Sequence, residues 1–309
     1  MENDIAIKTL NLTKTFENNL AVDNLNLEVR KGELFGLVGP DGAGKTTIMR
    51  LLSAILRPTS GDAWIAGHSV LGEEELIKEK IGYMSQRFGL YEDLTVMENI
   101  DFYADLYAVP LKERPSRYER LLSFSNLTPF KERLAGNLSG GMKQKLGLSC
   151  ALVHTPEVLF LDEPTGGVDP VSRRDFWRIL YDLLKERVTI FISTAYLDEA
   201  ERCTRIALVH KGKVLMTDEP SGVKKALGVP MIEISTPEER SAGDFLKSVD
   251  GVLSVNIYGD RLHVAIKNRE IAATIMELLK SKGISVQGQR EIVPSLEDVF
   301  ISMVSKSSE

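Results

Sequence analysis

The chain has 309 residues, 43% of them hydrophobic and 27% charged, which is typical of a globular protein with two domains or with one large domain and an appendage. Its formal net charge is −6 and no basic stripe stands out, so we expect no nucleic acid among its partners. Its two cysteines, Cys150 and Cys203, support neither a disulfide framework nor a zinc site, which favours a reducing compartment.

Apolar and polar side chains alternate over residues 5–30, which predicts two or three antiparallel strands. Phe16 lies in this stretch, just before a polar turn at residues 17–19. It is either a core residue of the sheet or an aromatic plate on which a nucleotide base stacks.

The next segment, Gly39–Thr47, reads Gly-Pro-Asp-Gly-Ala-Gly-Lys-Thr-Thr and fits a loop pattern whose backbone N–H groups bind nucleotide phosphates. An apolar run at 34–38 predicts a buried strand before the loop. Apolar residues at helical spacing predict a helix after it, which ends at Arg57 because Pro58 follows. This order favours a phosphate site over the alternative, a glycine-rich turn before an ordinary helix.

The chemistry of this loop gives its residues distinct roles. We expect Lys45 to reach the β- and γ-phosphates and the Thr46 hydroxyl to bind Mg²⁺. The predicted nucleotide-binding residues of the loop are Gly39, Pro40, Asp41, Gly42, Ala43, Gly44, Lys45, Thr46 and Thr47.

A strand at residues 81–86 ends in Gln86, and the segment after it changes character. Helical spacing, several prolines and dense charge over 93–135 predict an inserted helical subdomain, at about residues 89–137. A further helix begins at Leu138–Gln144. At its start Ser139, Gly140 and Gly141 expose backbone N–H groups to an anion, although Ser-Gly-Gly by itself is also a common loop tripeptide.

An apolar run at 158–161 predicts a strand that ends in two adjacent carboxylates, Asp162 and Glu163. Such a pair is costly at the end of a buried strand unless it has a function. Beside a phosphate loop, Asp162 would hold Mg²⁺ directly or through water, and Glu163 would act as general base toward the attacking water. The alternative is an acidic pair that only solvates the loop. Residues 188–194 predict another strand, and 206–216 a hairpin that turns at Lys211-Gly212.

The tail begins with Gly and Pro breaks at residues 217–230, which predict a linker with a short helix. Beyond it we expect a strand at 231–235, a helix opened by residues 236–239, a hairpin at 252–266, a helix at 271–279 and a final strand at 284–286. The order β-α-β-β-α-β predicts a small ferredoxin-like α+β domain at residues 226–309. No cluster of His, Cys or paired carboxylates appears in it, so we assign it no chemistry.

Residues 5–225 resemble the ATP-binding subunit of an ABC transporter, and the motifs above occur in that family's order. Gly39–Thr47 matches the Walker A loop, Val158–Glu163 the Walker B strand with its catalytic glutamate, Gln86 the Q-loop, Leu138–Gln144 the family signature and Gly167–Asp169 the D-loop. Phe16 matches the aromatic plate beneath adenine. The sequence is most similar to the first cassette of bacterial tandem-cassette export ATPases. Residues 294–300 resemble the closing motif of drug- and polysaccharide-exporter cassettes, which implies a role in dimer contact or regulation for the domain at 226–309, with a stabilising appendage as the alternative.

The resemblance implies an α/β fold, a P-loop NTPase (RecA-like) core in residues 1–225, with an antiparallel β subdomain besides the inserted helices. It implies ATP and Mg²⁺ as ligands, with Thr46, Gln86 and Asp162 at the metal and with Lys45, Gln86 and Glu163 in hydrolysis. Two cassettes of the family pair head to tail, so Ser139, Gly140 and Gly141 would complete the ATP site of the partner.

The implied partners are a second cassette, in a homodimer or heterodimer, and a membrane permease. No apolar run approaches the roughly 18 residues needed to cross a bilayer, so we expect a cytoplasmic protein held on the inner face of the membrane by the permease. Phe88, Leu90 and Tyr91 are the expected contacts with that permease.

One position departs from the family pattern. Ala195 stands where the family has a switch histidine that hydrogen-bonds the γ-phosphate. An alanine methyl group neither donates nor accepts a hydrogen bond, so we expect an ATPase that energises an exporter but turns over slowly at this site. The alternative is that Tyr196 or a water takes over and turnover is normal. Two other classes stay open: a non-transport ABC protein, and a cassette that holds nucleotide with little hydrolysis.

Overall fold

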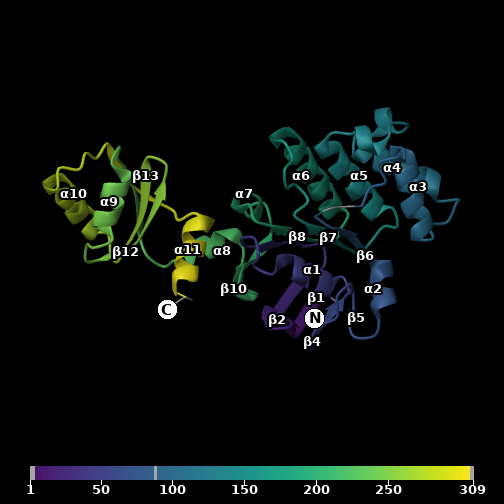
Figure 1. Cartoon of the computed structure of the whole chain (residues 1–309), viewed down its shortest axis with the longest axis horizontal. Helices are drawn as coiled ribbons and strands as arrows, with labels where there is room; N and C mark the ends of the chain where they lie inside the picture. The colour runs from purple at the N-terminus through teal and green to yellow at the C-terminus, as the bar shows by residue number, and fades with distance from the viewer. Residues whose placement is uncertain (1–3, 87–88, 307–309) are drawn as a thin grey trace. The chain divides into compact units, whose positions relative to one another are not determined.

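The computed structural model describes residues 4–86 and 89–306, and the chain divides into two compact units, residues 1–217 and 218–309. The first unit contains two β-sheets and most of the helices (Figure 1). Within the described ranges, no helix is both long enough and apolar enough to span a membrane.

An antiparallel sheet opens the first unit. Its strands are β1 (Ile5–Phe16), β2 (Asn19–Arg30), β4 (Ser60–Ile65) and β5 (His68–Ser69), in the order β2-β1-β4-β5. The prediction of antiparallel strands over residues 5–30 is confirmed, because β1 and β2 pair along their whole length. Ile7 and Leu12 of β1 are both buried, because the register shift between Thr9 and Leu12 brings them to the same face.

The second sheet of this unit carries the edge at which the motifs meet. It is formed by β3 (Leu34–Val38), β6 (Ile81–Met84), β7 (Val158–Asp162), β8 (Thr189–Thr194), β9 (Arg205–His210) and β10 (Lys213–Asp218), in the order β10-β9-β3-β8-β7-β6. All pairs from β9 through β6 are parallel. The carboxyl ends of five strands therefore lie at one edge, and ligands of open α/β sheets bind at such edges.

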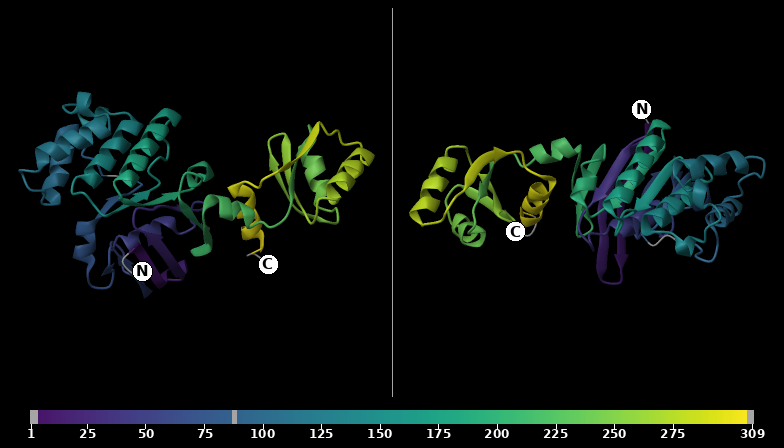
Figure 2. Two further views of the ribbon diagram at one scale, coloured as in Figure 1. Left: turned by 180° about the vertical axis from the view of Figure 1, so that it is seen from behind. Right: turned by 90° about the horizontal axis from the view of Figure 1, so that it is seen from above.

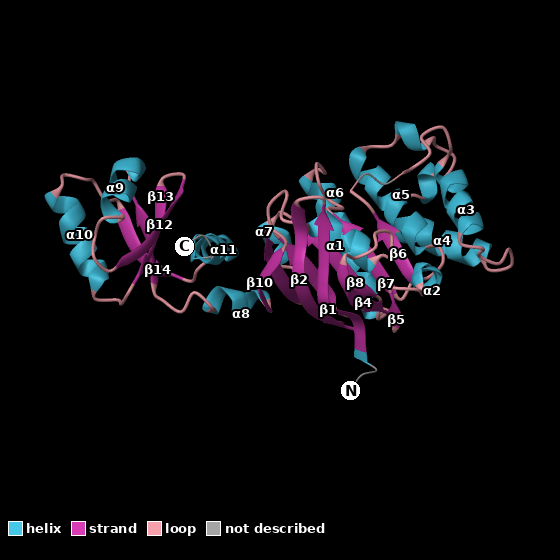
Figure 3. Ribbon diagram, turned by 60° about the horizontal axis from the view of Figure 1, so that its bottom comes forward, coloured by secondary structure: helices cyan, strands magenta, loops and turns pink. Residues whose placement is uncertain are grey.

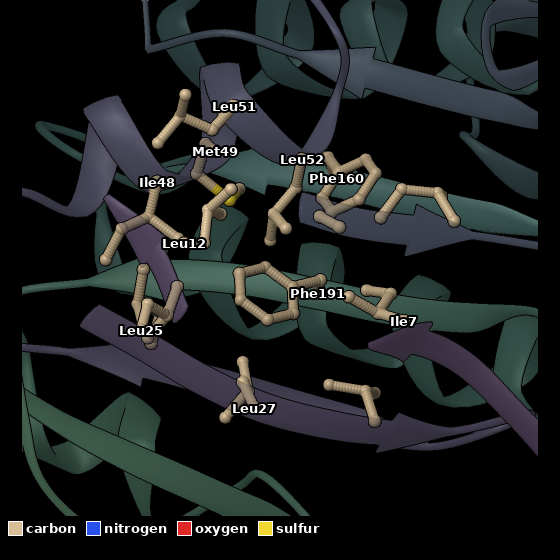
Figure 4. Close-up of a cluster of buried hydrophobic side chains, with 14 of the residues drawn as sticks. Ile7, Leu12, Leu25, Leu27, Ile48, Met49, Leu51, Leu52, Phe160 and Phe191 are labelled. Atoms are coloured by element: carbon tan, nitrogen blue, oxygen red, sulfur yellow. The ribbon is translucent and has the colours of Figure 1, made fainter. Parts of the chain in front are cut away.

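The hydrophobic core lies between the two sheets (Figure 4). Phe160 and Phe191 of the parallel sheet face Leu12 and Leu27 of the antiparallel sheet, and α1 (Lys45–Leu52) packs among them. Helices α5 (Gly140–Leu152) and α6 (Pro170–Lys185) cover the other face of the parallel sheet (Figure 1). Of two shorter helices, α2 (Glu74–Lys80) contacts β5 and β6, and α7 (Leu197–Ala200) contacts β3 and β8.

The first helix is shorter than its apolar spacing predicts, because α1 ends at Leu52 and not at Arg57. Ala54 adopts a left-handed φ of 55°, which interrupts the helical hydrogen bonds. The N–H groups of Ile55 and Leu56 then both donate to the carbonyl of Arg50. Leu56 still packs on the core from this turn, so the apolar pattern continues where the helix does not.

The helical segment begins after a capping box, in which Thr95 and Glu98 satisfy each other's backbone N–H groups. Its helices are α3 (Val96–Leu106) and α4 (Arg114–Phe124), followed by the short 3-10 helices Thr128–Phe130 and Ala135–Asn137. Buried Asn99 donates to the carbonyls of Tyr91, Leu94 and Thr95, and so fixes the entry to α3. Figure 3 shows α3 and α4 beside α5, at the β6 end of the parallel sheet.

The second unit contains β11 (Met231–Ser235), α9 (Glu239–Leu246), β12 (Val252–Tyr258), β13 (Arg261–Ile266), α10 (Ile271–Ser281) and β14 (Gly288–Ile292), after α8 (Pro220–Lys225) and before α11 (Leu296–Lys306). The strand order β12-β13-β11-β14 is that of a ferredoxin-like sheet, as predicted. Helices α9 and α10 cover one face and α11 lies at the other (Figure 2). The predicted strand at 284–286 is wrong: Ile284 and Val286 pack on the core from a loop, and pairing with β11 begins at Gly288.

Candidate functional site

A cavity of about 710 Å³ opens at the carboxyl edge of the parallel sheet. Its walls come from the start of β2, the loop after β3, the ends of β6 and β7 and the turn between β9 and β10. The lining residues are Asn19, Leu20, Ala21, Asp41, Gly42, Gly44, Lys45, Thr46, Thr47, Gln86, Glu163, Lys211 and Gly212. Most of the predicted phosphate loop and two of the predicted polar side chains therefore share one cavity.

The loop after β3 needs glycine where it approaches β2. Gly44 has a φ of 102°, and a Cβ atom there would lie 2.6 Å from the carbonyl oxygen of Ala21. Because α1 starts directly afterwards, the first N–H groups of that helix have no partners within it. The loop and the helix start thus present backbone donors toward an anion.

Lys45 provides a fixed positive charge in the cavity, and its side chain is only 4% exposed. Its Nζ donates to the carbonyl oxygens of Gly39 at 2.8 Å and Pro40 at 3.1 Å. The same Nζ lies 2.9 Å from Oε1 of Glu163 and 4.0 Å from Oδ1 of Asp41. Loop carbonyls thus hold the ammonium group close to two carboxylates.

Glu163 receives hydrogen bonds from two predicted site residues. Besides Lys45, the Nε2 of Gln86 donates to Oε2 of Glu163 at 3.0 Å. Glu163 has a left-handed φ of 47°, and its N–H donates to both the carbonyl and the hydroxyl oxygen of Ser193. Non-glycine residues held in this conformation cluster at functional sites, because the surrounding structure must stabilise them.

Asp162 is buried at the end of β7, and only one of its oxygens has a protein partner. The Ser193 hydroxyl donates to Oδ1 at 2.6 Å, whereas Oδ2 has no hydrogen-bond partner within the described part of the chain. Burial and the negative charge of Asp162 raise the pKa of the nearby Tyr83 hydroxyl.

The donor set around Asp162 fits Mg²⁺ as it is usually bound beside phosphates. No group of three or more His, Cys, Asp or Glu side chains in the described ranges could enclose a metal by itself. Mg²⁺ is commonly bound through one or two carboxylates, with waters and substrate phosphates completing its shell. The free Oδ2 of Asp162 and the hydroxyl of Thr46 fit such a shell.

Other predicted residues lie outside this cavity. Phe16 ends β1 with its ring 43% exposed, and the ammonium group of Lys14 lies 5.1 Å from the ring centroid. Ser139 caps α5, accepting a hydrogen bond from the N–H of Met142, and Gly140 faces open space. None of these three lines the cavity that the described residues form.

The expected permease contacts are only partly visible. Phe88 lies outside the described residues. Tyr91 is 48% exposed and packs edge-on against Phe102. Leu90 is partly exposed next to it.

Ala195 lies at the same sheet edge, exposed after the last residue of β8. Hydrogen bonds and a stacking contact hold the neighbouring residues, Thr194 and Tyr196. The Thr194 hydroxyl donates to Glu199 and accepts from the N–H of Tyr196, and the guanidinium of Arg173 stacks 4.7 Å from the Tyr196 ring centroid. Ala195 itself presents a methyl group only.

Sequence reasoning missed five cavity residues: Asn19, Leu20, Ala21, Lys211 and Gly212. The N–H of Gly212 donates to the carbonyl of Ala43 at 2.9 Å, which brings the predicted β9–β10 hairpin onto the phosphate loop. No local pattern marks these residues, because the pairing of β9 with β3 brings the hairpin there.

Two family profiles match the sequence. One is described as "ABC transporter" and matches residues 22–166; the other is described as "ATP-binding protein DrrA1-3-like, C-terminal domain" and matches residues 219–304. The chain is 41% identical to the probable multidrug ABC transporter ATP-binding protein YbhF of Escherichia coli K12, over 98% of its own length. It spans only 52% of the length of that relative.

Two other relatives match over nearly their full length. The daunorubicin resistance ATP-binding protein DrrA2 of Streptomyces coeruleorubidus is 32% identical, over 98% of this chain and 96% of that protein. The bacitracin transport ATP-binding protein BcrA of Bacillus licheniformis is also 32% identical, over 96% of this chain and 97% of that protein.

Solved structures with the same fold are ATP-binding cassettes. A dimeric cassette in a post-hydrolysis state, bound to ADP and Pi, superposes with a TM-score of 0.63 at 26% identity, covering 69% of this chain and 98% of that one. The cbiO1 protein of Clostridium perfringens, part of the ABC transporter complex cbiONQ, gives 0.66 at 26% identity over 71% of this chain and 90% of that one.

Proposed function

Because the chain belongs to the family of ABC transporter ATP-binding proteins, we propose that it binds and hydrolyses ATP to drive a membrane exporter. The observation that carries this proposal is the convergence of Lys45, Gln86 and Glu163 on one cavity beside the phosphate loop. The names of its relatives refer to multidrug, daunorubicin and bacitracin transport or resistance, which favours a drug or another small molecule as cargo.

In this proposal each polar side chain of the cavity has a separate role in ATP hydrolysis. Lys45 neutralises phosphate charge, and Glu163 accepts the proton of the attacking water. Thr46, Gln86 and Asp162 would hold Mg²⁺, which when bound would supply positive charge to offset that of the phosphates. The Gln86 amide, which contacts Glu163 at 3.0 Å, keeps the base oriented.

A second cassette would complete the site. Ser139 and Gly140 are exposed at the start of α5, where Ser139 is the N-cap. We infer that Ser139, Gly140 and Gly141 contact the ATP bound to the partner cassette, and that Phe16 stacks on adenine. The pair is a homodimer or a heterodimer with an intact cassette.

A membrane permease is the proposed second partner, reached from the cytoplasmic side. A groove of about 750 Å³ between α2 and the end of α3 supports this, because Ile55 and Leu106 line it while 58% and 64% exposed. Exposed apolar side chains of this kind are typical of interaction sites. Leu90 and Tyr91 lie in the loop before α3 and are proposed contacts as well.

The alanine at position 195 favours slow ATP hydrolysis at this site. The side chain of Ala195 cannot donate a hydrogen bond to a γ-phosphate. The hydroxyl of Tyr196 is the alternative donor, since Arg173 stacks on the Tyr196 ring and, among the described residues, leaves that hydroxyl unengaged. The second candidate function, a cassette that mainly holds ATP, rests on the same alanine.

The test is ATP hydrolysis by the chain assembled with its permease and partner cassette in lipid vesicles. Wild type should hydrolyse ATP, and Glu163→Gln should reduce the rate at least about 100-fold while ATP still binds, because an amide cannot accept the proton. Ala195→His should raise the rate several-fold. An Ala195→His rate equal to wild type contradicts the slow site, and wild-type hydrolysis no faster than Glu163→Gln contradicts the proposed ATPase.

A further inference from the structure

A second lysine lines the cavity besides Lys45. Lys211 is exposed in the turn between β9 and β10 and belongs to the lining, although it lies far from every motif in the sequence. Lys45 is buried and already engaged, since Glu163 and two carbonyl oxygens surround its ammonium group. The two cations therefore differ in what they can still bind.

The backbone fixes the place of Lys211 against the phosphate loop. Gly212 donates its N–H to the carbonyl of Ala43 and accepts from the N–H of Asp23, both at 2.9 Å. Lys211 and Gly212 have φ angles of 47° and 77°, which is the pattern of a tight hairpin turn with two left-handed residues. Asn, Asp or Gly usually takes the first position of such a turn, so lysine is an unusual residue there.

The charge of Lys211 is not paired with an anionic side chain of the cavity wall that the described residues form. Asp41 and Glu163 are the anionic side chains of the lining, and Lys45 lies within 4.0 Å of both. The Lys211 side chain forms no hydrogen bond or ion pair with a residue in the described ranges. Lys213, two residues further along the same hairpin, pairs with Asp23 at 3.1 Å. Without Lys211, the formal charge of the lining would be negative, which opposes the binding of a polyanion.

We propose that Lys211 is a further nucleotide-binding residue of this chain, whose ammonium group contacts the phosphates of the bound nucleotide. This rests on the proposed function, because it presumes ATP in the cavity. The flexible four-carbon stem lets the charge reach from the turn toward the phosphates, and the residue offsets the negative charge that Asp41 adds to the loop.

The experiment measures the affinity of the purified full chain for a non-hydrolysable ATP analogue, at low and at high salt. Lys211→Met should weaken binding about three- to tenfold at low salt, because one partly solvated charge contact is lost. Lys211→Arg should restore affinity to within about twofold, since it keeps the charge. Lys213→Met is the matched control on the same hairpin and should bind like wild type.

Measurements at two salt concentrations distinguish the loss of a charge contact from a local distortion of the hairpin. The deficit of Lys211→Met should shrink at high salt, where exposed charges are screened. A deficit that is independent of salt, or equal affinities of Lys211→Met and wild type, overturns the inference.

Lys45→Ala serves as the reference for the proposed function: if wild type binds the analogue and Lys45→Ala does not, then the outcome at Lys211 concerns Lys211 alone. If wild type does not bind, the proposed function fails.

Discussion

Glu199 is a buried carboxylate of α7 that joins the loop after β7 to the end of β8. Thr165 and Thr194 both donate their hydroxyl groups to it, and Nε of Arg173 lies 3.6 Å from one of its oxygens. A buried charge is unfavourable unless such partners offset its lost hydration. The carboxylate thereby connects the segment that follows Walker B to the strand end that precedes Ala195.

Removal of this carboxylate should therefore lower the free energy of unfolding. We expect Glu199→Leu to cost about 3 kcal/mol, because it leaves two buried hydroxyl groups without their acceptor and removes an ion-pair partner of Arg173, and Glu199→Gln to cost about 1–2 kcal/mol. Urea unfolding of the full chain measures both. Asp198→Asn is the control: its side chain is 64% exposed and 3.8 Å from Arg173, so stability should hardly change. Equal stability of Glu199→Leu and wild type would contradict this account.

Prediction from the sequence worked for residues whose role follows from local chemistry. A glycine loop with Lys45, and a strand that ends in Asp162 and Glu163, carry their signal within a few residues, and the structure brings Lys45 and Glu163 to 2.9 Å. Lys211 and Leu20 carried no such signal. They reach the cavity only because β9 pairs with β3 and β2 approaches the phosphate loop, and single-residue patterns do not encode pairing between distant strands.

At the level of elements, the start of α5 contains two glycines with opposite surroundings. A Cβ atom on Gly141 would lie 2.3 Å from the Cβ and Oγ atoms of Ser172 in α6, so this glycine allows α5 and α6 to pack closely. A Cβ atom on Gly140 would meet no other heavy atom within 4 Å. Packing between helices thus explains Gly141, but it does not explain Gly140.

Alanine at these two positions should separate folding from function. Gly141→Ala should destabilise the chain by about 1–3 kcal/mol, because the methyl group forces α5 and α6 apart. Gly140→Ala should leave stability unchanged or slightly raised, since alanine is the better helix former. It should nevertheless reduce ATP hydrolysis of the assembled transporter at least about tenfold if Gly140 faces the partner's phosphates. Thermal unfolding and hydrolysis rates measure the two effects, and a normal rate for Gly140→Ala would exclude that contact.

The element boundaries that sequence patterns misplaced have a common physical cause. Leu56 after α1, and Ile284 and Val286 before β14, are apolar and pack on a core from loops. Periodicity reports burial and not hydrogen bonding, so it continues through such segments. Strand and helix limits depend on backbone features such as the left-handed φ of Ala54, which no side-chain pattern announces.

On the scale of the whole molecule, the second unit has its own core and its own buried polar network. Asp298 of α11 accepts hydrogen bonds from Asn256, Tyr258 and His263 of the sheet and from Ser295. These bonds fasten the last helix to the face of the sheet that α9 and α10 leave uncovered. Both tryptophans, Trp64 and Trp177, belong to the first unit, so tryptophan fluorescence reports on that unit alone.

Acid should weaken the second unit through Asp298. Burial by itself raises the pKa of this carboxyl, but the hydrogen bonds from Ser295, His263 and Asn256 outweigh burial and hold the pKa below its ordinary value. The Asp298 carboxyl therefore binds a proton more readily in the unfolded chain than in the folded one. The stability that its charged form contributes is present above about pH 4, the pKa in the unfolded chain, and is lost as the pH falls through the lower pKa of the folded state.

Asp298→Asn should accordingly lower stability by about 1–3 kcal/mol at pH 7 and by progressively less below pH 4, where the wild-type carboxylate is itself protonated. If the two units unfold separately, far-UV circular dichroism will show the earlier transition of the variant while the tryptophan fluorescence transition stays that of wild type. Asp250→Asn is the matched control, because that side chain is 99% exposed. If the fluorescence transition shifts as much as the dichroism transition, the two units unfold as one. If the difference in the free energy of unfolding between Asp298→Asn and wild type stays constant from pH 7 to pH 3, the carboxylate charge is not what stabilises α11.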